Sequence, residues 1–252
     1  MKSIILAAGY ATRLYPLTRN FPKPLLKVGE KTILDRLIDD IDQFENINEH
    51  IIVSNHKFVS QFEKWKNSRS FNHEVTVIDD GSTENENRIG AVKDILFAIE
   101  KCNINEEILV LAGDNILDFS LKDFVEYAEQ KKSPCIMRHY EKSVEKLSRT
   151  GVAVIDENDK VLKMQEKPSI PESHWAVPPF YIYTKDDLPF IKKACTKDEN
   201  GKAPCGTDAP GDFISWFCSQ KTVYAWQMTG IRHDIGNLES LEEAKLAFST
   251  TK

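Results

Sequence analysis

Residues 5–18 read ILAAGYATRLYPLT, a stretch that predicts a strand followed by a loop. An apolar run ends in a turn of small residues that carries Arg13, with Pro16 close behind. In an open α/β sheet, the turn after the first strand is the usual phosphate-binding loop. Gly9 would let backbone N–H groups approach phosphate oxygens, and the planar guanidinium of Arg13 can bridge two of them. Taken alone, the stretch also fits a surface turn with an ordinary exposed arginine.

Strands and helices alternate through the first half of the chain. Apolar runs predict strands at 3–8, 51–53, 75–78 and 108–112, and helical spacing predicts helices at 32–44, 58–65 and 91–100. Thr32 and Asp35 have the spacing of a capping box at the start of the helix predicted at 32–44. The alternation predicts an α/β fold with a Rossmann-like, mostly parallel mixed sheet flanked by helices.

The second half is richer in strands. The patterns predict strands at 134–140, 152–156, 161–165, 180–183 and 222–228, and helices from Ser120 to about 130, at 211–219 and at 238–248. Residues 195–211 are the clearest long loop. We interpret residues 1–252 as a single domain, with a first half at about 1–118 and a smaller, strand-rich second half at about 119–252.

Composition limits the class of protein. The 252 residues are 41% apolar, which is enough for a sizeable core, and the net charge of −6 includes no long basic block. Nucleic acid and membrane are therefore not expected as partners. The five cysteines lack CxxC spacing, and the first apolar run is too short for a signal peptide or a membrane span. We expect a cytoplasmic protein with reduced thiols.

Five motifs in one order carry a family resemblance. LAAGYATRLYPLTRNFPKPLL resembles the opening motif of the sugar-phosphate nucleotidylyltransferases, which include glucose-1-phosphate thymidylyltransferases and related uridylyl-, cytidylyl- and guanylyltransferases. The other four are VLAGDN at 110–115, TGVAV at 150–154, QEKP at 165–168 and HDIG at 233–236. They resemble the family's Gly-Asp-Asn, Tyr-Gly-Val-Val, Glu-Glu-Lys-Pro and Asp-(Ile/Thr)-Gly motifs.

The resemblance implies nucleotidyl transfer. It makes residues 1–252 a single nucleotidyltransferase domain, with a nucleotide-binding half at about 1–118 and an acceptor-binding half at about 119–252. A phosphate oxygen of the acceptor would attack the α-phosphorus of a nucleoside triphosphate and release pyrophosphate, which requires cations and in-line alignment but no general base. The resemblance puts Arg13 on the β- and γ-phosphates, Lys23 near the α-phosphate and Lys167 on the acceptor phosphate. Asp114 and Asp234 each border an apolar run, so their carboxylates could meet at one sheet edge and bind Mg²⁺, and the resemblance makes them the metal ligands.

The predicted site residues fall into four sets. The catalytic set is Arg13, Lys23 and Asp114, and the metal set is Asp114 and Asp234. The nucleotide-binding set is Ala8, Gly9, Tyr10, Ala11, Thr12, Arg13, Ile89, Gly90 and Asp114. The acceptor-binding set is Gly151, Glu166, Lys167 and Val177, with the Glu166 carboxylate able to accept from two sugar hydroxyls.

Three departures from the family pattern leave the substrates open. Ala11 replaces a glycine, at a cost of about 1 kcal/mol if that position needs a positive φ. Thr150 replaces a tyrosine, and Pro178-Pro179 stiffen the wall where the family holds its sugar. We favour dTTP or UTP with a hexose 1-phosphate, for a nucleotide sugar used in polysaccharide synthesis. The alternatives are CTP with a non-sugar phosphate or phosphonate such as phosphocholine, and a catalytically silent regulatory homologue. The family resemblance also suggests that the protein forms a homodimer.

Overall fold

The structure is a computed structural model, and it describes residues 1–249. The chain forms two compact units, each built from separate segments. Unit 1 contains Met1–Arg88, Ala112–Lys122 and the residues from Thr229 onward; unit 2 contains Ile89–Leu111 and Asp123–Met228. The prediction of a single nucleotidyltransferase domain, with halves meeting near residue 118, stays a prediction.

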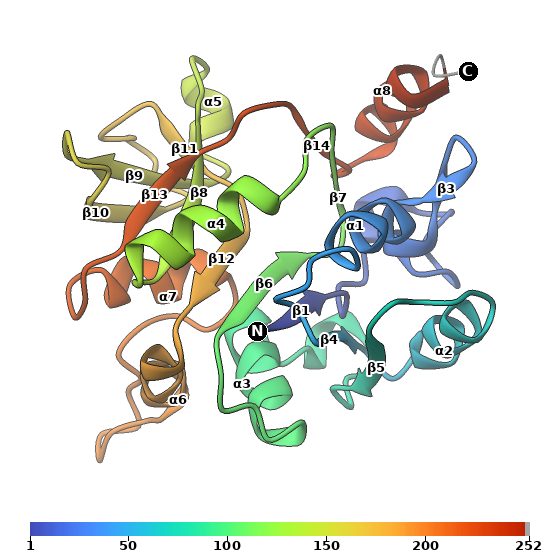
Figure 1. The fold of residues 1–252 in the computed structure, drawn as a ribbon, viewed down its shortest axis with the longest axis horizontal. Coiled ribbons are helices and arrows are strands. Elements are labelled where there is room, and N and C mark those ends of the chain that lie inside the picture. The colour runs from blue at the N-terminus through green and yellow to red at the C-terminus, as the bar shows by residue number, and fades with distance from the viewer. Residues whose placement is uncertain (250–252) are drawn as a thin grey trace. The chain divides into compact units, whose positions relative to one another are not determined.

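Unit 1 is built on three parallel strands (Figure 1). They lie in the order β1 (Lys2–Leu6), β4 (Glu49–Ser54), β5 (Glu74–Asp79), and α1 (Ile33–Ile41) and α2 (Val59–Asn67) are the helices that follow the first two strands along the chain. Two small antiparallel pairs complete the unit: β2 (Lys27–Val28) with β3 (Lys31–Thr32), and β7 (Asn115–Leu117) with β14 (Arg232–Asp234). The predicted capping box is confirmed, because Thr32 Oγ1 accepts from Asp35 N and Asp35 Oδ2 accepts from Thr32 N.

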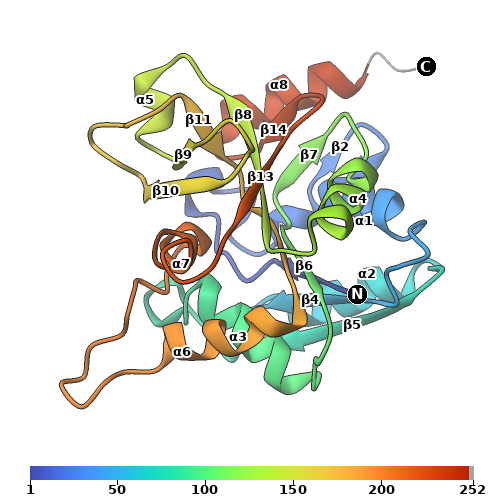
Figure 2. The same cartoon turned by 60° about the vertical axis from the view of Figure 1, so that its left-hand side comes forward.

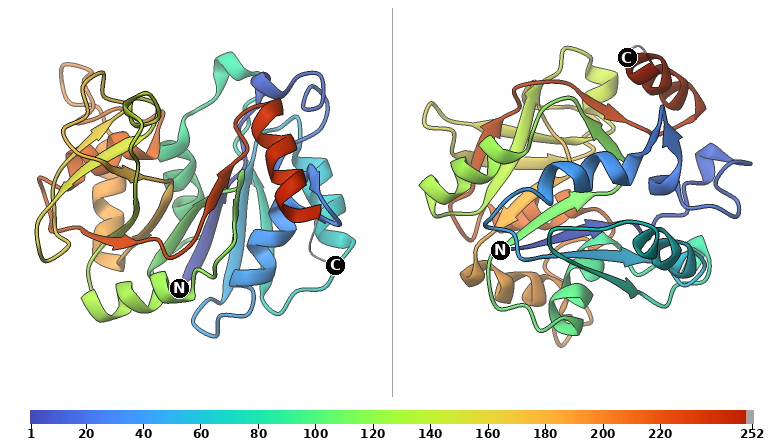
Figure 3. Two further views of the ribbon diagram at one scale, coloured as in Figure 1. Left: turned by 90° about the horizontal axis from the view of Figure 1, so that it is seen from above. Right: turned by 45° about the vertical axis from the view of Figure 1, so that its right-hand side comes forward.

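The last helix, α8 (Leu238–Ser249), packs beside β2, as Figure 3 shows. Its Leu241 and Ala244 join a buried cluster with Leu14, from the loop after β1, and Ile235, from the turn after β14. The side chains of the cluster are almost wholly buried. The burial of Leu14 and Ile235 in one cluster fixes the two segments that carry Arg13 and Asp234.

Unit 2 is dominated by an antiparallel sheet. Its strands run in the order β10 (Val161–Glu166), β9 (Gly151–Ile155), β11 (Trp175–Val177), β8 (Cys135–Tyr140), β12 (Phe180–Tyr183), β6 (Ile108–Ala112), and β13 (Tyr224–Gln227) pairs parallel with β8. The helices are α3 (Ala91–Lys101), α4 (Lys122–Lys131), α5 (Val144–Leu147), α6 (Leu188–Cys195) and α7 (Pro210–Phe217). Figure 2 shows α7 close to β10, which it contacts.

The predicted α/β fold with parallel and antiparallel strands is confirmed. The strands β1, β4 and β5 of the first half pair in parallel, and most strands of the second half pair antiparallel, as the patterns predicted; the parallel pair of β13 with β8 and the antiparallel pair of β2 with β3 depart from this division. The first strand ends at Leu6, two residues earlier than predicted, so Ala7 and Ala8 already belong to the loop. Within residues 1–249, no helix is both long and apolar enough to span a membrane.

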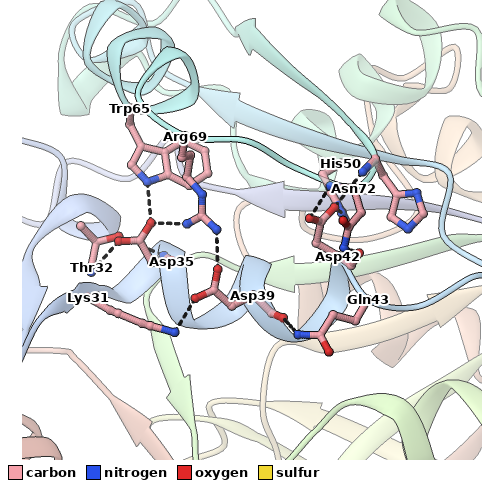
Figure 4. Close-up of polar contacts among 11 residues, drawn as sticks. Lys31, Thr32, Asp35, Asp39, Asp42, Gln43, His50, Trp65, Arg69 and Asn72 are labelled. Carbon is pink, nitrogen blue, oxygen red and sulfur yellow. Dashed lines mark hydrogen bonds and ion pairs between the residues drawn. The ribbon is translucent and has the colours of Figure 1, made fainter.

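A buried polar cluster joins the end of α1 to β1 and β4. Figure 4 shows Asp42, His50 and Asn72 of this cluster. The ring of His50 is fully buried; its Nδ1 lies 2.7 Å from Ser3 Oγ and its Nε2 lies 3.2 Å from Asp42 Oδ1. Asp42 also accepts from the backbone N–H groups of Asn72 and His73. Burial lowers the pKa of His50 below its usual value near 6.5, against the opposite effect of Asp42. The imidazole is therefore neutral in the folded protein at pH 7.

We expect acid to destabilise the protein through His50. The unfolded chain takes up a proton on this ring as the pH falls below about 6.5, whereas the folded chain resists protonation. The free energy of unfolding should therefore fall below pH 6.5, by up to about 1.4 kcal/mol per pH unit from this group. Urea denaturation at pH 7.5 and 5.5 measures the loss. His50→Gln should show a smaller difference between the two pH values; an equal loss in this variant would contradict the assignment.

Candidate active site

The loop after β1 is open to solvent along its backbone. Gly9, Thr12 and Arg13 are exposed, and a Cβ added to Gly9 would meet no atom within 4 Å. Among the described residues, the backbone N–H groups of Gly9, Ala11 and Thr12 have no hydrogen-bond acceptor, and the Arg13 guanidinium has no acidic partner. Free donors together with a free guanidinium are what an anionic ligand needs.

Two loop residues differ from their neighbours. Tyr10 points into the fold: it is 5% exposed and its ring lies 6.2 Å from that of Phe58. Ala11 has φ 48° and ψ 45°, the left-handed conformation. The sequence comparison anticipated a position that favours glycine, and the backbone explains why: the Cβ of alanine is strained there.

Ala11→Gly should stabilise the protein. Glycine relieves the left-handed strain of about 1–2 kcal/mol, although its more flexible unfolded chain cancels part of the gain. We expect a net increase of about 0.5–1 kcal/mol in the free energy of unfolding, measured by urea denaturation. The matched control is Ala8→Gly, because Ala8 is buried and its φ is not positive. Ala8→Gly should destabilise; a destabilised Ala11→Gly protein would contradict the strain at Ala11.

Lys23 is held between two prolines in a short 3₁₀ turn, Lys23–Leu25. Its Nζ lies 2.6 Å from Asp114 Oδ2 and donates to the carbonyl oxygen of Ile235 at 2.6 Å. The side chain is only 11% exposed. Three segments that are distant in the sequence therefore meet at this ammonium group.

Asp114 reaches this position because a glycine precedes it. Gly113 N donates to Leu6 O at 3.0 Å, and a Cβ on Gly113 would lie 3.1 Å from Leu6 O and from Ile5 Cγ2. Residue 113 therefore lies against the end of β1, next to the open loop. Asp114 Oδ1 accepts from Asn115 Nδ2 at 2.7 Å, and its side chain is 36% exposed.

Asp234 lies on the strand paired with β7. The register places Asp234 opposite Asn115, and Ile235 N donates to Asp114 O at 3.3 Å. The structure thus brings the two predicted metal residues to neighbouring positions. Asp234 is 53% exposed, with Arg232 Nη1 3.5 Å from its Oδ2. Within residues 1–249 no group of three or more acidic, His or Cys side chains is arranged as a metal site.

Unit 2 brings its own predicted set together. Gly151 pairs with Glu166 across β9 and β10 and with Val177 across β9 and β11. A Cβ on Gly151 would lie 2.6 Å from Met164 Cε and 3.4 Å from Glu166 Oε2, so a larger residue at 151 would displace the end of the Met164 side chain. Lys167 follows with φ 45°, and its Nζ lies 3.5 Å from Glu166 Oε1. Burial raises the pKa of the Glu166 carboxyl, and Lys167 opposes this effect.

Helix α7 supplies residues that the sequence patterns did not single out. A Cβ on Gly211 would lie 1.9 Å from Glu166 Oε2, so a larger residue at 211 would displace the Glu166 carboxylate from its present position. The charge of Asp212 adds to the rise in the pKa of Glu166. A hollow of about 650 Å³ opens here, lined by Met164, Gln165, Glu166, Pro168, Ser169, Ile170, Glu172, Asp212 and Ser215. The sequence signal that could have identified these residues is the pair Gly211-Asp212 at the end of the predicted long loop 195–211.

Ile89 and Gly90 belong to unit 2, not to the unit of the loop after β1. Gly90 has φ 97° and precedes α3, and a Cβ there would lie 2.6 Å from Thr207 O. The loop carbonyls of Thr207 and Asp208 accept from Val92 N and Ala91 N. These contacts give Gly90 a structural reason to be glycine; its predicted role in nucleotide binding stays a prediction.

The family model described as nucleotidyl transferase matches residues 2–251. The chain belongs to the nucleotidyl transferase family. The family predicted from the five motifs is therefore confirmed. Which nucleotide and which acceptor this nucleotidyltransferase uses does not follow from the family match.

Relatives and solved structures agree with this assignment. The chain is 29% identical to the bifunctional protein GlmU of Methanocaldococcus jannaschii and 28% identical to a glucose-1-phosphate adenylyltransferase of Fervidobacterium nodosum. The matches cover 97% and 96% of this chain but 53% and 60% of those proteins, so the chain spans little more than half of their length.

Two solved structures share the fold. A putative glucose-1-phosphate thymidylyltransferase from Bacillus anthracis, in complex with a sucrose, has a TM-score of 0.80 at 25% identity over 100% of this chain and 96% of that one. A UDP-glucose pyrophosphorylase complexed with UDP-glucose has a TM-score of 0.80 at 20% identity, over 100% and 99%. These likenesses support the fold across the whole chain.

Proposed function

We propose that this nucleotidyltransferase joins a nucleoside triphosphate to a sugar 1-phosphate, giving a nucleotide sugar and pyrophosphate. The observation that carries the proposal is the meeting of Lys23, Asp114 and the β14 segment beside an open loop with free N–H groups. The similar proteins include a glucose-1-phosphate adenylyltransferase and a putative glucose-1-phosphate thymidylyltransferase, which supports a sugar phosphate as acceptor. We favour dTTP or UTP as donor.

The chemistry assigns one role to each cation. An acceptor phosphate oxygen forms a bond to the α-phosphorus while the bond from that phosphorus to the pyrophosphate oxygen breaks. Because the nucleophile is already an anion, the protein must chiefly offset repulsion between two anions. In this proposal Arg13 binds the outer phosphates, Lys23 stabilises charge at the α-phosphate, and Lys167 binds the acceptor phosphate.

Asp114 and Asp234 fit Mg²⁺. Magnesium keeps several waters and usually takes one or two carboxylates together with substrate phosphates, and two part-exposed carboxylates on neighbouring positions match that need. Bound there, the ion would neutralise charge on triphosphate oxygens.

The acceptor hollow supports a second candidate. Its lining includes the carboxylates of Glu166, Glu172 and Asp212. Negative charge of this kind would also suit an acceptor that carries a cationic group, such as phosphocholine or an aminoalkylphosphonate, with CTP as donor. Pro178 and Pro179, which join β11 to β12, depart from the sugar-handling pattern in the same part of the chain.

Pyrophosphate release with magnesium tests both candidates. The common nucleoside triphosphates are crossed with hexose 1-phosphates, phosphocholine and an aminoalkylphosphonate. Turnover with a sugar 1-phosphate supports the first candidate and names both substrates. Turnover only with a non-sugar acceptor supports the second. Nucleotide binding without turnover on any acceptor would contradict both and favour a silent regulatory homologue.

Glu166→Gln should weaken acceptor binding selectively. The amide keeps one acceptor oxygen but loses the charge and the ability to accept from two hydroxyls equally well. We expect the KM of the acceptor to rise about 10-fold, with the KM of the triphosphate unchanged. Glu145→Gln is the matched control, since Glu145 is an exposed glutamate that lies outside this hollow and is paired with Arg149. Equal acceptor KM values for Glu166→Gln and the unchanged protein would remove Glu166 from the acceptor site.

A further inference from the structure

Two buried side chains hold the backbone of the loop after β1. Asn55 is fully buried, and its Nδ2 donates to the carbonyl oxygen of Ala8 at 2.9 Å. Thr18 is 1% exposed, and its Oγ1 donates to the carbonyl oxygen of Ala11 at 2.7 Å. The open part of the loop is therefore fixed at both ends by side chains that no ligand can reach directly.

These contacts set the direction of two N–H groups. In a planar trans peptide the C=O and the N–H of the same unit point in opposite directions. Because the oxygen of Ala8 is turned toward buried Asn55, the N–H of Gly9 is turned away from it, and the exposed Gly9 has open space around it. By the same geometry, the hydrogen bond from Thr18 Oγ1 to Ala11 O turns the N–H of Thr12 away from Thr18 and outward. Neither N–H has an acceptor among residues 1–249.

The register of the sheet explains why residue 55 can do this. β1 and β4 run parallel with Leu6 opposite Val53, so two residues further on Ala8 lies beside Asn55. The other end of the amide is also fixed, because Asn55 Oδ1 accepts from Phe58 N at 3.0 Å. The side-chain amide of asparagine can donate on one side and accept on the other, as both contacts require, whereas an aspartate at neutral pH can only accept.

We propose that Asn55 is a positioning residue for nucleotide binding, with Thr18 as its counterpart, and that the two aim the Gly9 and Thr12 N–H groups at the phosphates of the nucleoside triphosphate. The inference rests on the proposed function. It adds two residues that touch neither substrate and whose effect is transmitted through backbone carbonyls. A loop whose donors are already oriented binds phosphate without a further entropy cost for ordering them.

The competing role for Asn55 is to cap the turn that leads into α2. Its carbonyl oxygen accepts from Phe58 N and Val59 N in addition to the side-chain contact. Asn55→Asp separates the two roles, since aspartate is an equally good cap but cannot donate to Ala8 O. Asn55→Ala removes both contacts without adding charge. Thr18→Val removes only the donor to Ala11 O, which keeps its bond from Leu14 N and so keeps the loop folded.

Isothermal titration calorimetry with dTTP, UTP, CTP and ATP, in the presence of Mg²⁺ and without acceptor, measures binding apart from turnover. The triphosphate that binds most tightly is then titrated into each variant. We expect Asn55→Asp, Asn55→Ala and Thr18→Val each to raise its Kd about 10- to 100-fold, as for one lost hydrogen bond to a charged group. Ser54→Ala is the matched control, because Ser54 is equally buried and its Oγ donates to a carbonyl outside the loop, that of Asn55. Its Kd should stay within about twofold.

The outcomes are distinct. If Thr18→Val and Asn55→Ala bind as tightly as the unchanged protein, the positioning role is overturned, even if Asn55→Asp binds weakly, since added charge alone would then explain the loss. If Asn55→Ala does not fold, Thr18→Val decides by itself. If the unchanged protein binds none of the four triphosphates, the proposed function fails, and this inference fails with it.

Discussion

Replacing Asp114 by asparagine should reduce kcat by about 10³-fold. The change removes the charge that faces the Lys23 ammonium at 2.6 Å and one of the two carboxylates proposed to hold Mg²⁺. The fold should survive, because the side chain is 36% exposed and an amide can still accept a hydrogen bond from Lys23. Pyrophosphate release at saturating substrates measures the loss, and titration with Mn²⁺ by paramagnetic resonance measures the weaker metal binding.

Asp118→Asn is the matched control for Asp114. Asp118 follows β7 directly, and its Oδ1 accepts from Ile231 N at 2.6 Å near β14, so its contact joins the same two strands. Its carboxylate is not paired with Lys23, and kcat should change less than about threefold. Retention of more than a tenth of kcat in Asp114→Asn would show that this carboxylate is not part of the catalytic machinery.

The sequence patterns located most long elements of the fold. Strands such as Glu74–Asp79 and helices such as Ile33–Ile41 have strong periodicity, and the structure places them within a few residues of the predicted ranges. The patterns missed β2, β3, β7, β11, β14, α5 and α6. The five strands have two or three residues each, which is too few for alternation to be recognisable. The helix α5 has only four residues, and the helix α6 (Leu188–Cys195) follows a 3₁₀ turn and has a proline at its second position.

The residues of the candidate site also include some that the sequence predicted and some that it did not. Charged residues in recognisable motifs, such as Lys23, Asp114 and Glu166, were all predicted as site residues. Asn55, Thr18 and Gly211 were not, because their effect depends on neighbours distant in the sequence: the carbonyls of Ala8 and Ala11, and the carboxylate of Glu166. A side chain that acts through another residue's backbone leaves no local pattern, so only the folded structure can identify it.

Lys23→Met should reduce kcat by about 10²- to 10³-fold while leaving the protein folded. Methionine keeps the length and the apolar stem that fit between Pro22 and Pro24, but it removes the ammonium that joins Asp114 to the carbonyl of Ile235. The loss should fall on kcat rather than on acceptor KM, since charge at the α-phosphate grows in the transition state. Steady-state kinetics with each substrate varied in turn separate the two parameters.

Two further variants make the Lys23 result specific. Lys27→Met removes an exposed lysine four residues away and should leave kcat within about twofold. Lys23→Arg keeps the charge but replaces a compact ammonium, held at 2.6 Å from two oxygens, by a larger planar fork, and it should recover little activity. Full activity in Lys23→Arg would mean that positive charge in this region suffices and that the geometry at Asp114 and Ile235 is unimportant. Full activity in Lys23→Met would remove this residue from catalysis and leave Arg13 as the unit 1 cation proposed for the phosphates.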